Sequence, residues 1–387
     1  MSGHRGRSRR RPARRRAVLA AVGAVACLAV VAAVVMSSGG NPSAPPVDPA
    51  AAETNRTVAV VTVSAQVGTP SSTPTPSRSA ARASASPSAA ARGQLASTLD
   101  GCPVAPADSI WRAKVDTLPV ASRSSAYVAN IGAQSHVHAD FGSGTWDGEP
   151  IGMPITLIPP GTSPAHVSFD YADESDPGPY PIPAGASIEG GAQSDGDRHV
   201  IALDPSDCRD YELYDATASS GGAWHAGSGA VFNLNSDALR PAGWTSADAA
   251  GLPILPGLAR YDEAAAGAID HALRITVPKS QAAYLWPARH DASSDTDPDL
   301  PPMGLRLRLK ADVDISGLPP EARVVAQALK TYGAIVADNG SAWYISGTQD
   351  QRWNNDELSA LSALTGSDFE AVDTSSLQVS ANSGAAR

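Results

Sequence analysis

Cysteine is scarce in this chain, which has three cysteines among 387 residues. Cys27 lies in an apolar run near the N-terminus, so only Cys102 and Cys208 remain for the rest of the sequence. This scarcity excludes a zinc site built from four cysteines. Two cysteines in an exported domain are able to form a disulfide. We therefore expect Cys102 and Cys208 to be paired, the alternative being two separate buried thiols.

Two motifs that would indicate a reaction are also missing. The sequence has no glycine-rich phosphate loop, and Gly227-Ser228-Gly229 lacks the five-residue G-x-S-x-G pattern of a nucleophile elbow. Neither an internal repeat nor a regular alternation of strands and helices is present, which argues against a doubly wound parallel sheet. The sequence is therefore more informative about location and architecture than about chemistry.

Basic residues are few after the N-terminal region. Residues 99–387 keep 37 of the 39 acidic side chains but only 17 of the 29 basic ones. Phosphate contacts require clustered lysine and arginine, so nucleic acid is excluded as a partner of this surface. The acidic excess favours solubility outside the cell.

The first 36 residues have the pattern of a membrane signal anchor. Eight arginines lie within residues 1–16, and residues 17–36 are uncharged and mostly apolar. Such a run is long enough to cross a bilayer as a helix, with its arginine-rich flank in the cytoplasm. The alternative is a cleaved signal peptide, but the apolar run is long and no A-x-A site ends it. We predict a single-pass membrane protein, with residues 17–36 as the membrane contact and the C-terminal domain outside the cytoplasm.

The remaining chain divides by composition. Residues 37–98 are rich in Ala, Ser, Pro and Thr, and such a segment buries too little apolar surface to fold, so we predict a disordered linker. Residues 99–373 have the size of a folded domain, and residues 374–387 are predicted to be a polar tail.

The periodicity of the domain predicts a β-rich α+β fold. Alternating leucines and charged residues predict a long strand over 305–315 with one face in water, followed by a helix over 320–332. Asn339-Gly340 predicts a tight hairpin, and a short helix is expected over 356–364 after Asn355. Further strands are expected over 199–203, 211–214, 230–234 and 271–277. We therefore expect a curved antiparallel sheet or sandwich with a few helices.

Three runs carry a family resemblance. They are FDYADESDPGPYPIP (169–183), GWTSADAAGLP (243–253) and WPARH (286–290). With these runs the domain resembles a family of exported bacterial proteins of unassigned function. The resemblance implies no reaction and no site residue.

Two patterns suit metal ions weakly. His136, His138 and Asp140 have the H-x-H-x-D spacing of a zinc site, but Phe141 stands where a further histidine would complete a metallo-hydrolase motif. The alternative is a pair of surface histidines, and zinc is not favoured. Two acidic loops, 170–176 and 295–299, could bind calcium or could be solvated loops. No other cofactor is indicated.

The long loops 170–198 and 236–268 are where we expect a site. Asp248, Glu263 and His271 are the candidate catalytic residues, because paired carboxylates can divide acid and base duties. Candidate substrate-binding residues are Trp244, Trp224, His199 and Arg260. Asp197, Glu212 and Asp338 are further candidates for the same cleft. The simpler interpretation of Asp262-Glu263 is the start of a helix, where acidic residues are favoured.

Two functional hypotheses follow. The first is a glycan-cleaving enzyme, such as a glycoside hydrolase, that uses Glu263 and a second carboxylate. The second is a non-catalytic envelope module that binds glycan or protein. They differ in geometry, because an enzyme needs two carboxylates in one cleft, whereas a binding module needs only an aromatic platform.

Overall fold

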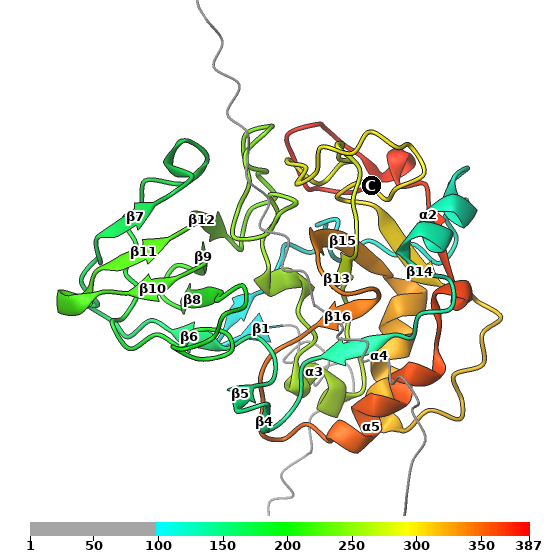
Figure 1. Ribbon diagram of the computed structural model, residues 1–387, viewed down its shortest axis with the longest axis horizontal. Coiled ribbons are helices and arrows are strands. Elements are labelled where there is room, and N and C mark those ends of the chain that lie inside the picture. Colours follow the sequence, from blue (N-terminus) through cyan, green and yellow to red (C-terminus); the bar gives the residue numbers. More distant parts are fainter. Residues whose placement is uncertain (1–97) are drawn as a thin grey trace, which may run out of the picture. The chain divides into compact units, whose positions relative to one another are not determined.

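The computed structural model describes residues 98–387 (Figure 1). The predicted cytoplasmic stub, transmembrane helix and nearly all of the linker lie outside these residues. Within the described part, none of the helices has both the length and the apolar character needed to cross a membrane. This part of the chain is a β-rich α+β fold with open sheets and few helices, as the sequence predicts.

The larger sheet has six strands in the order β17-β14-β15-β13-β16-β3. It is mixed rather than purely antiparallel, because β13 is parallel to β15 and β16 is parallel to β3. Its strands are β3 (His138–Asp140), β13 (Leu273–Val277), β14 (Arg306–Leu309), β15 (Ala334–Asn339), β16 (Tyr344–Ser346) and β17 (Phe369–Val372).

The two faces of this sheet differ in chemistry. Leu307, Ile275 and Ile345 alternate with the polar residues of their strands and belong to the main apolar cluster, which also includes Val325 and Leu329 of helix α4 (Pro320–Thr331). Helix α4 is close to the predicted 320–332, and α5 (Asn355–Ser359) begins near the predicted 356, with Asn354 as its N-cap. The other α-helices of residues 98–387 are α2 (Ser124–Ile131) and α3 (Tyr261–Ala266).

Two predictions about this sheet are wrong. Strand β14 spans only Arg306–Leu309, and both arginines are buried because residues 109–118 cover them: Arg306 donates to the carbonyl of Ile110 at 2.6 Å. Asn339-Gly340 does not close a hairpin either, since β13 lies between β15 and β16. The alternating pattern predicted a solvent-exposed face for this strand. Residues 109–118, which are distant in sequence, cover that face and bury its arginines.

A second region contains a four-stranded sheet in the order β12-β9-β8-β6 and a three-stranded sheet in the order β10-β11-β7. Strands β8, β9 and β12 confirm the expected strands near 199, 211 and 230. The strands are β6 (Ile155–Leu157), β7 (Val167–Phe169), β8 (Val200–Asp204), β9 (Arg209–Tyr214), β10 (Thr217–Ala218), β11 (Trp224–Ala226) and β12 (Ser228–Asn233). Two small pairs remain, β1 (Thr98–Leu99) with β2 (Cys102–Pro103) and β4 (Thr145–Trp146) with β5 (Glu149–Pro150).

Both ends of the domain are tied into the fold. The predicted disulfide is confirmed, since Cys102 is bonded to Cys208 across 106 positions of sequence. Part of the predicted polar tail packs on the domain: the carbonyl of Gly384 accepts the N–H of Ile110 at 2.7 Å, and the carbonyl of Ala381 accepts Arg289 at 2.6 Å. Residues 374–387 are therefore part of the folded domain.

Strand β9 carries two carboxyl groups that are wholly buried. Asp210 and Glu212 are two positions apart, so they share one face of the strand, and both are 0 % exposed. Glu212 accepts the N–H groups of Ile254 and Leu255, and its side chain shares a hydrogen bond with the neighbouring carboxyl of Asp210. Burial raises the pKa of both carboxyls, that of Asp210 to about 7.

This pair predicts a stability that falls as pH rises. Below pH about 4 the carboxyl of Asp210 is protonated in both states; between about 4 and about 7 the folded state keeps a proton that the unfolded state releases. The substitution Asp210→Asn replaces this group by an amide that is uncharged at every pH and has a shape similar to that of the protonated carboxyl. We expect its free energy of unfolding to be close to that of the wild type at pH 5 and higher than the wild type at pH 8, measured by urea denaturation. Parallel pH profiles for the two proteins would contradict this account.

Candidate functional site

A row of polar residues crosses four strands of the six-stranded sheet. Asp140 on β3 is paired with Ser346 on β16, and the antiparallel register of β16 with β13 places Arg274 opposite Ser346. Arg274 Nη1 donates to Ser346 Oγ at 2.8 Å. These side chains lie on the face opposite to the one that packs on α4, because Ile275 and Ile345 alternate with them.

A bulge in β15 adds Asp338 to this row. Ile275 is paired with Val336, but the next residue, Thr276, is paired with Asp338, so Ala337 is the extra residue. Without this insertion Asp338 would lie on the apolar face. The carbonyl of Ala337 accepts the N–H of Ala250 at 2.8 Å, which joins the bulge to the loop that carries Asp248.

The guanidinium of Arg274 holds these residues together. It binds Asp248 through two bonds, Nε to Oδ2 at 2.9 Å and Nη2 to Oδ1 at 2.8 Å. The same Nη2 donates to Asp338 Oδ2 at 3.0 Å. Arg274 and Asp248 are buried, while the side chain of Asp338 is 17 % exposed. Such a bidentate pair is both strong and geometrically specific.

The segment 246–248 bridges the two larger sheets. On one side Asp248 reaches Arg274 of β13. On the other, Ser228 Oγ of β12 donates to the carbonyl of Ser246 at 2.6 Å, and His199 Nε2 lies 3.1 Å from the carbonyl of Ala247. His199 Nδ1 lies 2.5 Å from a carboxylate oxygen of Glu189.

The three runs that carry the family resemblance meet around this segment. Glu174, in the first run, accepts the N–H of Thr245 at 3.1 Å, and Asp176 forms an ion pair with Arg240. In the third run, Arg289 donates to the carbonyl of Arg240 at 2.7 Å and His290 Nδ1 lies 2.8 Å from the carbonyl of Ala249. The first and third runs therefore position residues 240–250.

The electrostatics of the cluster favour a proton on Asp338. Burial and the neighbouring carboxylate of Asp248 raise the pKa of Asp338 to about 7, although Arg274 opposes the shift. Burial disfavours the charged form of His199, but Glu189 outweighs it and raises the pKa of His199 to about 9. The charge of His199 in turn keeps the pKa of Glu189 below its usual value, against the effect of burial. Asp338 is thus a carboxyl poised to give up a proton near neutral pH.

The structure brings two of the predicted catalytic residues, Glu263 and His271, together and gives the third, Asp248, a different partner. Glu263 forms its own buried cluster, with Oε1 2.5 Å from Arg260 Nη2 and Oε2 3.2 Å from His271 Nε2. All three are at most 4 % exposed. Asp248 instead belongs to Arg274, so the two carboxylates that sequence analysis paired have different partners. Glu263 is in the first turn of α3, as the simpler interpretation predicted.

The predicted substrate-binding residues are largely enclosed. Trp224 is 2 % exposed and packs in the second apolar cluster, and His199 and Arg260 are also buried. Trp244 is half-buried, and the guanidinium of Arg240 lies 5.6 Å from its ring centre. Trp224, His199 and Arg260 therefore offer no open face to a ligand.

The metal patterns have other contacts. His136 Nδ1 lies 2.7 Å from the carbonyl of Ser362, and His138 stacks on Tyr344 at 4.3 Å between ring centres. In the second acidic loop, Asp295 and Asp297 accept backbone N–H groups within the loop. Across residues 98–387 no group of three or more His, Cys, Asp or Glu side chains has the arrangement needed to hold a metal ion.

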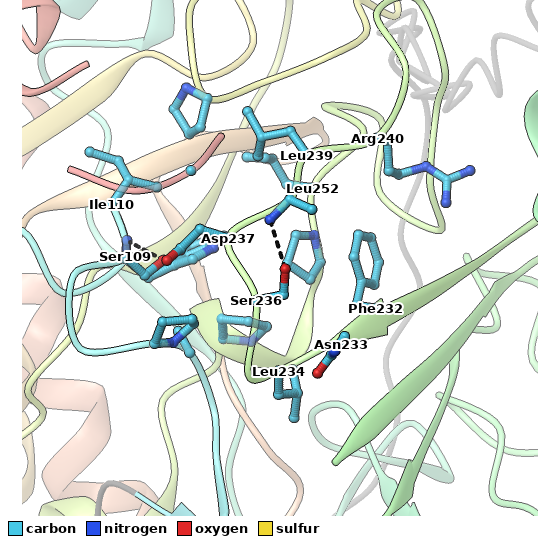
Figure 2. A pocket seen from close by; sticks show the side chains of 18 of the residues that line it. Ser109, Ile110, Phe232, Asn233, Leu234, Ser236, Asp237, Leu239, Arg240 and Leu252 are labelled. Atoms are coloured by element: carbon cyan, nitrogen blue, oxygen red, sulfur yellow. Dashed lines mark hydrogen bonds between the residues drawn. The ribbon is translucent and has the colours of Figure 1, made fainter. Parts of the chain in front are cut away.

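A pocket of about 320 Å³ lies at a different place (Figure 2). Phe232 and Leu234 come from the end of β12 and its following turn, and Asp237 and Arg240 come from the loop beyond. None of Asp140, Glu189, Asp248, Arg274 or Asp338 lines it. The charge of Arg240 is matched by Asp176, and Arg209, Asn233 and Asp237 add further polar side chains to the apolar ones of the lining.

Sequence reasoning missed Arg274, the centre of the cluster. A signal was present: Arg274 interrupts an otherwise apolar strand, Ala272-Leu273-Arg274-Ile275. A charged residue inside a buried strand needs a partner, which here is Asp248. Glu189 gave no comparable signal, because it lies in a long loop.

No family model matches this chain, and no curated protein or solved structure matches it either. The resemblance to exported bacterial proteins therefore stays a prediction.

Replacing Arg274 tests its role in stability. Arg274→Met leaves the buried carboxylate of Asp248 without its partner, and we expect a loss of about 3–5 kcal/mol in the free energy of unfolding. Arg352→Ala is the control, because Arg352 is exposed and its pairs with Asp262 and Asp350 are worth at most about 1 kcal/mol. Adding Asp248→Asn to Arg274→Met should restore part of the loss. Equal losses for Arg274→Met and Arg352→Ala in urea denaturation would disprove the role.

Proposed function

We propose that this domain is a hydrolase that cleaves glycans outside the cytoplasm, with Asp338 as its proton donor. The observation that supports this most is the environment of Asp338, which is partly exposed and held between a buried carboxylate and Arg274. A carboxyl that keeps its proton near neutral pH suits general acid catalysis. We therefore propose Asp338 as the catalytic acid in place of Glu263, whose side chain is buried.

The second carboxylate that we propose is Asp197. It is exposed, it lies two residues from His199, and its charge contributes to the raised pKa of Asp338. In the proposed reaction Asp338 gives its proton to the leaving oxygen while Asp197 takes a proton from the attacking water. The remaining hydroxide bonds to the sugar carbon as the glycosidic bond breaks, and proton exchange with solvent restores both carboxyls.

The location is also part of the proposal. The basic and apolar N-terminal pattern favours a membrane anchor at residues 17–36, and the disulfide is compatible with an oxidising compartment. The domain would then act at the cell envelope at the end of a Pro- and Ser-rich linker.

A second candidate function is binding without catalysis. The pocket beside Phe232 and Arg240 supports it, because it could hold a ligand away from the carboxylates (Figure 2). A ligand that binds there without being changed would favour this function.

Asp338→Asn tests the proposed reaction. The amide keeps an oxygen for Arg274 but has no proton of comparable acidity, so we expect kcat to fall about 10²- to 10⁴-fold in an assay of newly formed reducing ends. In the wild type, kcat is expected to fall as pH rises through about 7, because the acid form of Asp338 is lost.

The matched control is Asp350→Asn, whose carboxylate pairs with the exposed Arg352. It should keep full activity. Unchanged activity in a folded Asp338→Asn protein, or a rate that rises above pH 7, would contradict the proposal.

A further inference from the structure

One aromatic side chain stands out by its exposure. Trp146 is 80 % exposed, the highest value among the large apolar side chains of residues 98–387 that lie at the surface. Single exposed apolar side chains are common on protein surfaces, but this ring leaves most of its surface available for stacking on a ligand. Trp146 did not figure among the candidates from sequence.

The backbone around Trp146 is fixed. It ends β4, and Asp147-Gly148 joins β4 to β5 with positive φ at both residues (52° and 90°), which matches a tight two-residue hairpin turn. The hairpin follows β3, which carries Asp140. After it, the N–H of Met153 donates to the carbonyl of Gly347 at 3.0 Å, directly beyond Ser346. Both ends of the hairpin are therefore attached to strands of the candidate site.

The register places Trp146 toward the loop that carries Glu189. Trp146 and Glu149 are cross-strand partners, so their side chains leave the same face of the hairpin. Glu149 Oε2 accepts Ser194 Oγ at 3.4 Å, and Ser194 lies in the loop between Glu189 and Asp197. The face of the hairpin that carries Trp146 is thus attached, through Glu149, to the loop that carries Glu189 and Asp197.

The charges around this ring select the ligand. Asp140, Asp147, Asp195 and Asp197 are exposed carboxylates on the hairpin or the neighbouring segments. The arginine of the loop, Arg198, is occupied, since its guanidinium donates to the carbonyls of Ala192, Ser194 and Ala216. Arg198 keeps its charge, but the four exposed carboxylates outnumber it, and its N–H groups are turned to these carbonyls, so an anionic sugar would meet net repulsion at these segments.

We infer that Trp146 is a stacking platform for an uncharged sugar ring of the substrate, so that the glycan is a neutral polysaccharide. This inference rests on the proposed function and names its substrate class. The flat indole covers the apolar face of a pyranose ring, while the neighbouring carboxylates accept hydrogen bonds from its hydroxyl groups.

Binding and cleavage are measured separately to test it. The full-length chain in detergent, carrying Asp338→Asn to prevent turnover, is titrated calorimetrically with cellohexaose, chitohexaose and hexagalacturonate. We expect one of the two neutral hexasaccharides to bind, and Trp146→Ala to weaken that binding at least about tenfold. Trp146→Phe should restore most of it. Tyr171→Ala, which removes another exposed aromatic side chain, is the control and should bind normally.

Three results would overturn the inference: no binding of either neutral hexasaccharide, equal binding by Trp146→Ala, or preference for hexagalacturonate. These outcomes leave the proposed reaction to be decided by product formation in the Asp338 experiment. Conversely, the wild-type protein could bind the glycan through Trp146 and release no product. That result would contradict the proposed hydrolase activity but support Trp146 as a sugar-binding residue.

Discussion

The buried guanidinium of Arg274 is the interaction on which the candidate site depends. It joins strand β13 to Asp248 through two bonds and to Asp338 and Ser346 through one each. A buried arginine without such partners would be costly, because desolvation penalises its charge. The same pairing fixes the segment 246–248 between the two larger sheets, so the stability of the domain and the geometry of the site have one origin.

This arrangement explains why a carboxyl can keep a proton beside an arginine. Asp248 takes two of the hydrogen bonds that the guanidinium offers, and its negative charge faces Asp338. Asp338 receives only one bond, and burial together with the charge of Asp248 disfavours its charged form. The two carboxyls that bind Arg274 therefore differ in environment. Asp248 is held in a structural ion pair, whereas Asp338 keeps a proton that it can give up.

The sequence predicted much of the fold and little of the site. Local patterns were sufficient for helix α4, strands β8, β9, β12 and β13, and the Cys102–Cys208 bond, because each depends on periodicity or on compartment. The order of strands was not predictable, since β13 inserts between β15 and β16 from about 60 residues upstream in a long-range pairing. Asp338 was noticed only as one carboxylate among several, because its orientation depends on a bulge that no local signal reveals.

A direct measurement of the pKa of Asp338 tests whether this carboxyl is protonated near neutral pH. Carbon-detected NMR of the aspartate-labelled protein follows each carboxyl through a pH titration, and the resonance absent from Asp338→Asn identifies the residue. We expect a midpoint near pH 7 for Asp338. A midpoint close to 4, the value of an ordinary aspartate, would contradict it.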